Sequence, residues 1–341
     1  MKINIKQHYY RNGLIILHIL FAILGFYTYF LNYRTSENLI IQKTLTKQAI
    51  IAKAGSLSVE NLLKSVKNDL SSFTFSFAKI DESASIDKDN TRATFITYMQ
   101  KAQLPINGIA LYDESGKLII IENRYDIRIG ENQNFSQTAF IQWSKNPLNK
   151  EKIFISTPYK ATTGASVGRT ILIVVKPVYF GKIYKGTLTI RLLVSNFKDA
   201  FITPLISDTD EDTFIIDSNG VLIAGNNALL NNNLFAYAQK QKWGQSIDFM
   251  NKLRMIIKNN TVQTTWNFQN QNEKPRTAFV GSSKIDIPDT DKDLYFVVTT
   301  SRDNVISSLN PLRSHGLVWL GFGLLTTVVG GIIVVLLKSS G

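Results

Sequence analysis

Cysteine is absent from this chain of 341 residues, and histidine occurs only three times, at His8, His18 and His315. Without cysteine the chain forms no disulfide and has no thiolate nucleophile. The long central part of the sequence has no histidine before its last residue, which excludes nucleophiles activated by histidine and the usual zinc sites there. The sequence therefore predicts that the protein is not an enzyme and holds no metal or other cofactor.

Charged residues are missing from two long runs, residues 13–33 and residues 316–337. Each run is long enough to cross a bilayer as a helix, which takes about 20 apolar residues. The first run could instead be a cleaved signal peptide. Such signals have a shorter apolar region and end at a pair of small residues, which the following stretch YFLNYRTSEN lacks. We therefore predict two transmembrane helices.

Basic residues outside the two runs indicate the orientation of the chain. Lys2, Lys6 and Arg11 precede the first run, and Lys338 follows the second. Because short basic segments stay on the cytoplasmic side, residues 1–12 and 338–341 are predicted to be cytoplasmic tails. Residues 34–315 then form a periplasmic or extracellular domain of a multi-pass protein in the cell (inner) membrane.

The outer region has 34 basic and 26 acidic residues, which gives a net charge of +8. Outside a cell, nucleic acid is not an expected partner. The excess of positive charge fits either a basic surface near an anionic lipid or ligand, or an ordinary solvated surface. The region is large enough for a sizeable core and is near the length at which one core divides into two.

A seam of apolar and small residues follows the first run at alternating steps of four and three. Such spacing predicts one face of a long helix over residues 37–78, which has no proline and a single glycine, Gly55. The members of the seam are Leu45, Ala49, Ala52, Ser56, Val59, Leu63, Val66, Leu70, Phe73 and Phe77. We expect the later half to pack on its own domain and the half near the membrane to contact a second copy, which predicts a homodimer.

A repeated pattern then appears in IALYDESGKLII, residues 109–120, and FIIDSNGVLIAG, residues 214–225. Each stretch enters a turn at an aspartate, Asp113 or Asp217, and leaves it as a second apolar run. Such a pattern predicts a β-hairpin. A structural role in the turn is favoured over a catalytic role for both aspartates.

Each hairpin has later companions at a nearly constant offset. GRTILIVVKPVYF and KGTLTIRLL follow the first hairpin, whereas PRTAFVGSSKIDI and LYFVVTTS follow the second. Helical stretches, FSQTAFIQW and NNLFAYAQKQ, lie between hairpin and companion. The offset predicts an α+β domain with a long N-terminal helix and two tandem modules, residues 105–197 and 208–305, each with an antiparallel sheet.

These stretches resemble the double Cache (dCache) sensor domain of bacterial transmembrane receptors. The resemblance covers about residues 37–310 and is carried by ISTPY, KPVYFGKIYKG, FIIDSNGVLIA and LYFVVTTSRDNV, in this order between two apolar runs. It implies two PAS-like (Cache) modules and a small ligand in the module farther from the membrane, residues 105–197. It also implies a part in signal transduction or chemotaxis.

The resemblance also suggests which residues would bind the ligand. Many members bind amino acids, with an Arg-x-Trp-Tyr motif on the ligand carboxylate and aspartates on two later strands at its ammonium. In this chain Asn132 stands in the place of the arginine, while Phe135 and Tyr159 keep two aromatic positions. Ala161 and Arg191 replace the two acids. An arginine in place of an ammonium-binding aspartate reverses the preferred charge, so a carboxylate is favoured over an amino acid.

The orientation of Arg191 remains open at this point. Turned inward, Arg191 would be a buried cation that needs an anion; turned outward, it would be an ordinary surface arginine. Strand alternation places it on one face with Thr187, Thr189 and Leu193, and places Leu188, Ile190 and Leu192 on the other.

Further candidates for the same site are Tyr179 and Arg169. The hydroxyls of Tyr159 and Tyr179 could meet a ligand, or both rings could simply pack in a sheet. Arg169 could line the pocket together with Arg124 and Arg128. Alternatively, these arginines form ion pairs with Glu122, Asp126 and Glu131, which is the interpretation we favour.

The sequence thus predicts a membrane-anchored extracytoplasmic sensor domain that binds a small molecule. Related receptors continue into a cytoplasmic signalling domain, which is missing after residue 341, so the output is either on a separate partner or in a part of the protein beyond this sequence. The alternative is an envelope interaction scaffold on the same fold that has lost its ligand. Asn132, Ala161 and Arg191 are compatible with that alternative.

Overall fold

The computed structural model describes residues 3–78, 86–103, 105–205, 211–225, 229–240, 246–268 and 276–339. Met1 and Lys2 of the predicted N-terminal tail lie outside this part of the chain, as do Ser340 and Gly341 of the predicted C-terminal tail. The chain divides into two compact units. One combines Met1–Thr44 with Arg302–Gly341, and the other is Leu45–Ser301.

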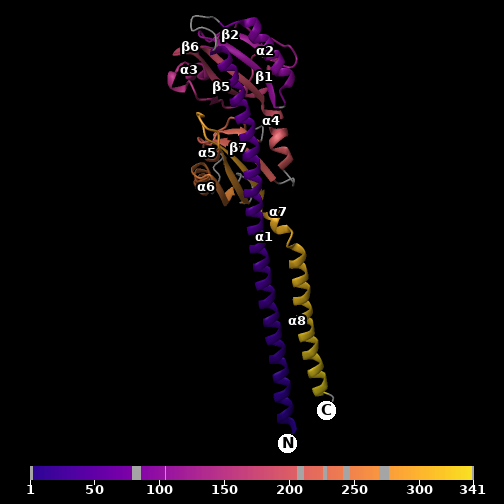
Figure 1. The fold of residues 1–341 in the computed structure, drawn as a ribbon. Coiled ribbons are helices and arrows are strands. Elements are labelled where there is room, and N and C mark those ends of the chain that lie inside the picture. Colours follow the sequence, from indigo (N-terminus) through magenta and orange to yellow (C-terminus); the bar gives the residue numbers. More distant parts are fainter. Residues whose placement is uncertain are drawn as a thin grey trace. The chain divides into compact units, whose positions relative to one another are not determined.

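The first unit consists of helices (Figure 1). It holds the first part of α1 (Ile3–Ala78) together with α7 (Arg302–Ser307) and α8 (Asn310–Ser339). An ion pair of 2.6 Å joins Arg302 Nη2 to Glu37 Oε1, and the Tyr29 hydroxyl donates to the Arg313 carbonyl at 3.5 Å. These contacts hold α1 beside the segment that leads into α8.

Among the described residues, α1 is the one helix that is long and apolar enough to cross a membrane. Its apolar stretch is not buried against protein, as expected for residues that face lipid. A shorter apolar segment, Gly321–Gly330, lies in α8. The N-terminal anchor is therefore supported, whereas the second span over residues 316–337 stays a prediction.

The predicted span and the predicted seam helix are one continuous helix, since α1 runs from Ile3 to Ala78. No proline interrupts this range, so no backbone donor is lost and no ring disturbs the helix. Residues 34–36, which lie between the two predicted segments, belong to the same helix.

The two predicted modules are called the distal module, residues 105–197, and the proximal module, residues 208–305. The distal module contains the first sheet, with strand order β2-β1-β6-β5-β3 and β4 paired to β5. All strand pairs in this sheet are antiparallel. Its strands are β1 (Ile106–Asp113), β2 (Leu118–Glu122), β3 (Phe154–Ile155), β4 (Tyr159–Lys160), β5 (Thr170–Phe180) and β6 (Ile183–Leu193). Its helices are α2 (Lys88–Lys101), α3 (Ala139–Lys145) and α4 (Val194–Phe201), with short 3-10 turns at Pro147–Asn149, Gly164–Ser166 and Thr203–Leu205.

The proximal module contains the second sheet, with order β8-β7-β11-β10-β9. Its strands are β7 (Glu211–Asp217), β8 (Leu222–Ala224), β9 (Thr261–Phe268), β10 (Arg276–Ile285) and β11 (Leu294–Ser301). Its helices are α5 (Leu234–Lys240) and α6 (Ser246–Lys258). The two sheets share the arrangement of hairpin, central strand and companion, which confirms the α+β class with two PAS-like modules.

The aspartate of each hairpin serves the turn. Asp113 Oδ1 accepts the backbone N–H groups of Ser115 and Lys117, each at 2.9 Å. Asp217 Oδ1 accepts those of Asn219 and Val221, also at 2.9 Å. Each carboxylate thus closes its own turn, as the spacing predicted.

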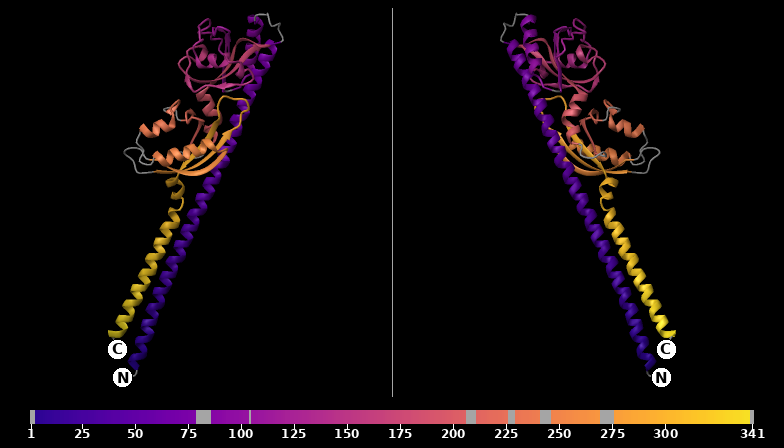
Figure 2. Two further views of the ribbon diagram at one scale, coloured as in Figure 1. Left: turned by 90° about the vertical axis from the view of Figure 1, so that its left-hand side faces the viewer. Right: turned by 90° about the vertical axis from the view of Figure 1, so that its right-hand side faces the viewer.

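The seam of α1 forms the main core with one face of both sheets. Figure 2 shows residues 45–78 of this helix alongside both sheets. Its members Ala52, Val59, Leu63, Val66 and Leu70 are at most 1 % exposed. The later half of the seam therefore packs on its own domain, as expected.

The half of the seam near the membrane also packs on its own chain, contrary to our expectation. Ala49 and Ala52 are buried, and Ser56 Oγ donates to Ser283 Oγ at 2.9 Å. Gly281 lies directly against the backbone of Gln48. The prediction of a dimer contact through Ala49 and Ala52 is therefore wrong, because the small residues of the seam admit strand β10 and not a second helix.

Gly55 should resist replacement although it lies within a helix. Alanine normally stabilises a helix by about 1 kcal/mol relative to glycine. At Gly55 a Cβ would clash with the ring of Phe296. Because overpacking costs about 1 to 3 kcal/mol, we expect Gly55→Ala to lower the free energy of unfolding in denaturant titrations of the full chain in detergent. Ala54→Leu on the exposed side is the control and should change stability by no more than about 0.5 kcal/mol; a stabilised Gly55→Ala would contradict the packing.

Candidate ligand site in the distal module

The two faces of the distal sheet have different environments. Leu188, Ile190 and Leu192 of β6 lie in the core beside α1. Leu193 belongs to a second cluster on the opposite face, under α3 and the loops that follow β2 and β4. The alternation predicted for β6 is thus confirmed, and Arg191 lies on the face turned away from α1.

Arg191 is buried, with 3 % of its surface exposed. It lies between Gly108 of β1 and Ile173 of β5 in the sheet register. Its Nη1 donates to the Thr163 carbonyl at 2.9 Å, and its Nη2 donates to the Tyr112 hydroxyl at 3.2 Å. Its Nε has no hydrogen-bond partner, and no carboxylate among the described residues forms an ion pair with it.

Within the described residues, this environment leaves a buried positive charge without a counter-ion. Two neutral oxygens satisfy part of the guanidinium, but an unpaired charge is costly in an apolar interior. A carboxylate is the natural complement, because two parallel N–H donors of arginine match its two oxygens. The free Nε and the adjacent Nη2 form such a pair of donors.

Two further predicted residues lie on the same face as Arg191. Burial raises the pKa of the Tyr159 phenol, nearby Tyr112 raises it further, and the positive charge of Arg191 lowers it in part. Tyr159 is therefore within electrostatic reach of Arg191, although 38 % of the residue is exposed. The ring of Phe135 packs edge-on against Tyr112 with centroids 5.5 Å apart.

The other three predicted residues are not brought to Arg191. Asn132 is exposed, and its backbone N–H donates to the Leu118 carbonyl at 2.7 Å. The Tyr179 hydroxyl donates to carbonyls at the end of α3, and its position lies six residues along β5 from Ile173, roughly 20 Å away. Arg169 is exposed and makes no side-chain hydrogen bond or ion pair within the described part of the chain.

Sequence reasoning missed Tyr112 and Thr163, the two residues that contact the guanidinium. Tyr112 comes directly before the turn aspartate of the first hairpin, where the second hairpin has Ile216. This difference within the repeat was the available signal. Thr163 acts through its backbone carbonyl, so its side chain carried no signal.

The face of the proximal sheet that is turned away from α1 can be compared with the face that holds Arg191 in the distal sheet. By register, Thr299 of β11 corresponds to Arg191, since each lies five residues beyond the residue paired with the turn aspartate. On the distal face the neighbouring positions of β1 and β6 are Ala110 and Thr189. On the proximal face they are Phe214 and Val297. Large apolar side chains and helix α6 close the proximal face, whereas the distal face combines small and polar neighbours of Arg191 with a second apolar cluster that includes Tyr112, Ile173 and Leu193.

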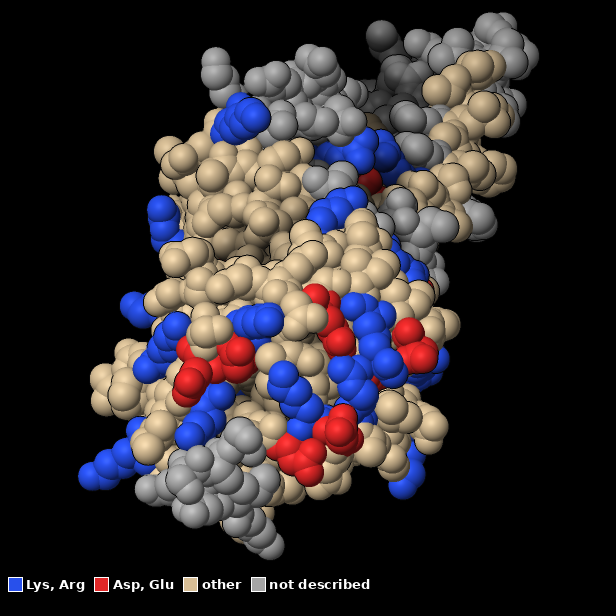
Figure 3. Space-filling model, turned by 90° about the horizontal axis from the view of Figure 1, so that it is seen from above, with Lys and Arg blue, Asp and Glu red and all other residues tan. Residues whose placement is uncertain are grey.

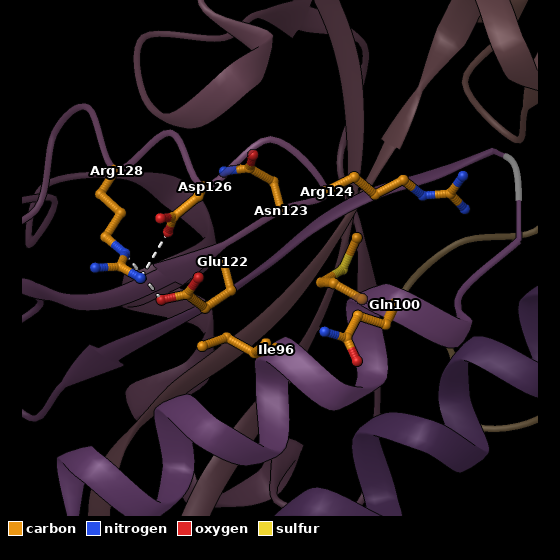
Figure 4. A pocket seen from close by; sticks show the side chains of 8 residues that line it. Ile96, Gln100, Glu122, Asn123, Arg124, Asp126 and Arg128 are labelled. Carbon is orange, nitrogen blue, oxygen red and sulfur yellow. Dashed lines mark ion pairs between the residues drawn. The ribbon is translucent and has the colours of Figure 1, made fainter.

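A separate pocket of about 470 Å³ lies between α2 and the segment after β2 (Figure 4). Arg128 there pairs with Glu122 at 3.2 Å and with Asp126 at 2.6 Å. Arg92 pairs with Glu122 at 2.5 Å and with Glu131 at 2.9 Å. Burial raises the pKa of Glu122 against the opposing effect of both arginines. The ion-pair interpretation is thus confirmed for Arg128. It is wrong for Arg124, which donates to the Ala102 carbonyl, and for Arg169, neither of which forms an ion pair within the described part of the chain. The charges that line this pocket are balanced within the protein.

The outer surface shows a similar mixture of charges. In Figure 3, basic and acidic side chains are interspersed on the face seen from above. An interspersed surface gives a weaker long-range field than a patch of one sign. The net positive charge of the outer region therefore does not concentrate on this face, and the buried Arg191 is the more specific feature.

No family model and no curated protein matches the chain. Solved structures do match. The periplasmic sensory domain of the Campylobacter jejuni chemoreceptor Tlp1 aligns with a TM-score of 0.60 and 16% identity, over 78% of this chain and 98% of that one. The ligand-binding domain of the Pseudomonas fluorescens chemoreceptor CtaA, solved with L-isoleucine, aligns with a TM-score of 0.56 and 12% identity, over 81% and 99%.

An extracellular ligand binding receptor from Desulfohalobium retbaense aligns with a TM-score of 0.53 and 12% identity, over 74% of this chain. The chain spans 40% of the length of that receptor. At these identities the likeness concerns the fold. The chain has the fold of a Cache-type periplasmic sensor domain, which agrees with the resemblance found in the sequence.

Replacing Arg191 by an apolar residue should leave the ligand-free fold intact. We expect Arg191→Met to change the free energy of unfolding by at most about 1 kcal/mol or to raise it, because removal of a buried unpaired charge offsets the lost hydrogen bonds. Arg92→Met is the matched control and should cost about 3 kcal/mol, because it takes a partner from the buried Glu122. Urea titrations of the full chain in detergent measure both, and a large loss for Arg191→Met would mean that Arg191 is mainly a clamp for the Thr163 loop.

Proposed function

We propose that the chain is a membrane-anchored extracytoplasmic sensor whose distal module binds a small carboxylate at Arg191. The single observation that carries this proposal is the buried guanidinium with a free Nε and no acidic partner among the described residues. A structural arginine in the interior would be expected to have an acid beside it, as the less deeply buried Arg92 has Glu122. The missing counter-ion is supplied by the ligand.

The proposed site is built mostly from hydrogen-bond donors. Arg191 Nε and Nη2 bind the carboxylate side-on, and the hydroxyls of Tyr112 and Tyr159 lie near the same charge. Phe135 contributes an apolar wall. Asn132, Tyr179 and Arg169, which the sequence also suggested, lie outside this group, so their part in ligand binding is not included in the proposed site.

The charge of the site distinguishes the proposed ligand from the amino acid bound by CtaA. An amino acid carries an ammonium beside its carboxylate, and an ammonium needs an acidic or neutral oxygen acceptor. No carboxylate in the described part of the chain pairs with Arg191. The position where related domains have the second acid is occupied by the buried Ala161. An organic acid without an α-ammonium is therefore the favoured class of ligand.

The proposed placement in the membrane follows the sequence. Both residues 13–33 and residues 316–337 cross the bilayer, so that the sensor lies in the periplasm or outside the cell and both tails are cytoplasmic. The protein is proposed to act in signal transduction or chemotaxis, without enzymatic activity and without nucleic acid, through a separate cytoplasmic partner or a signalling domain beyond this sequence.

A second candidate function is an envelope interaction scaffold with no small ligand. The observation that favours it is the aromatic packing on the distal face, where Phe135 and Phe140 both contact Tyr112, at 5.5 and 5.3 Å between ring centroids. Such packing occupies space that a ligand would use. A scaffold would not respond to any organic acid, so the same binding experiment separates the two.

Organic acids should raise the melting temperature of the full chain in detergent, because a ligand that binds only the folded state stabilises it. Arg191→Ala should weaken binding of the best acid by about tenfold to a hundredfold, since a charge-assisted hydrogen bond contributes about 1.5 to 3 kcal/mol. Arg254→Ala on the exposed side of α6 is the control and should bind as the parent does. A preference for amines without a carboxylate, or equal binding by Arg191→Ala, would contradict the proposed site.

The homodimer remains part of the proposal, through the side of α1 opposite the seam. Ile50 and Leu57 are 64 % and 41 % exposed and lie seven residues apart on this side. We expect Ile50→Cys to form disulfide-linked dimers in membranes and Ala52→Cys to form none, because Ala52 is buried in its own chain. Leu57→Cys tests the second exposed position in the same way. If neither Ile50→Cys nor Leu57→Cys forms a crosslinked dimer, this side of α1 is not a dimer contact.

A further inference from the structure

The connection between β10 and β11 joins the proximal module to the edge of the distal sheet. The Ile153 N–H donates to the Asp289 carbonyl at 2.8 Å, and the Asp291 N–H donates to the Ile153 carbonyl at 3.1 Å. Ile153 and Thr290 form a parallel β-bridge. The side chain of Asp291 adds a further bond, because its Oδ1 accepts the N–H of Ile155 in β3 at 2.8 Å.

This junction is continuous with the strand beside Arg191. Ile155 pairs with Val174 of β5. The next residue, Ser156, exchanges two hydrogen bonds of 3.0 Å with Ile173, one from its N–H to the carbonyl and one from the Ile173 N–H to its Oγ. Ile173 is the register partner of Arg191. Two strand spacings, roughly 10 Å, therefore separate the junction from the proposed ligand site.

We propose that Asp291 is a positioning residue whose side chain docks the proximal module on β3, and that acid tightens this docking and with it the binding of ligand at Arg191. The second half of the proposal rests on the proposed function, whereas the docking itself does not. Asp291 lies three residues before β11. This strand ends at Ser301, and the helical unit that contains α7 and α8 begins at Arg302. The contact thus connects the ligand-bearing sheet to the strand that leads out of the sensor.

The charge balance around Asp291 gives the direction of the pH effect. Burial raises the pKa of the carboxyl to about 6, although the Ile155 N–H and the charge of Lys292 lower it and Asp217 raises it slightly. Since the carboxyl is exposed when the modules separate, protonation favours the docked state. The stabilisation is complete below the ordinary pKa of an aspartate and is lost as the pH rises through about 6.

Other charged groups near the junction act mainly on Asp289. Lys67 of α1 pairs with Asp289 at 2.8 Å and also donates to the Pro288 carbonyl at 2.9 Å. The positive charges of Lys152 and Lys176 lower the pKa of Asp289 as well. Asp289 therefore stays ionised through the mildly acidic range, in which Asp291 becomes protonated.

Asp291→Asn tests the docking without any ligand. Asparagine keeps an oxygen for the Ile155 N–H but does not titrate. Between pH 7 and pH 4.5, the parent should gain stability relative to Asp291→Asn by about twentyfold in the unfolding equilibrium constant, as the shift from the ordinary pKa to about 6 requires. Asp286→Asn, in the same connection and exposed, is the control and should follow the parent profile. Parallel profiles for the parent and Asp291→Asn in the full chain would overturn the proposal.

The link to the ligand site is measured with acetate as the simplest carboxylate. After correction for the ionised fraction of acetate, the parent should bind up to about fourfold more tightly at pH 5.5 than at pH 7.5, and Asp291→Asn should bind equally at both. Acetate binding with no difference between the two proteins would overturn the positioning role. If acetate and other acids bind neither protein, the proposed ligand site fails, while the ligand-free profiles still decide whether Asp291 docks the modules.

Discussion

The packing of one face of α1 against both sheets is the contact on which the unit Leu45–Ser301 depends. Each sheet has an apolar face that would be open to water by itself, and the seam residues of α1 cover both faces in one continuous core. Close approach is possible because the helix and the strand each offer a glycine, Gly55 beneath Phe296 and Gly281 beneath Gln48. Burying apolar surface along this seam is the main favourable contribution to the joining of the two modules.

Once α1 covers one face, the opposite face of each sheet is free to differ. In the proximal module Phe214, Trp266 and Phe249 pack together there, with ring centroids 4.9 to 6.4 Å apart. In the distal module the corresponding face has a glycine, an alanine and two threonines around a buried arginine. The face turned away from α1 is thus a second core in each module, and the distal one differs by the buried charge of Arg191.

Arginine plays two different parts in the distal module. Arg92 lies between two glutamates and compensates the buried Glu122. Within the described residues, Arg191 donates hydrogen bonds to a carbonyl and a phenol and forms no ion pair. The contrast within one module supports the proposal that the charge of Arg191 is completed from outside the chain. It also supports the proposed preference for a carboxylate.

The sequence by itself determined the features that depend on local pattern: the long apolar helix near the N-terminus, the helix seam, the two hairpins with their turn aspartates, and the alternation in β6 that turns Arg191 away from α1. Each of these follows from residue spacing along one segment, because helices and strands have fixed periods. Only the tertiary structure decided that Ala49 and Ala52 are covered by their own chain. It also decided that Tyr112 and Thr163 meet Arg191. Those contacts join segments far apart in the chain, and a single sequence records which face a side chain takes but not which distant segment covers it.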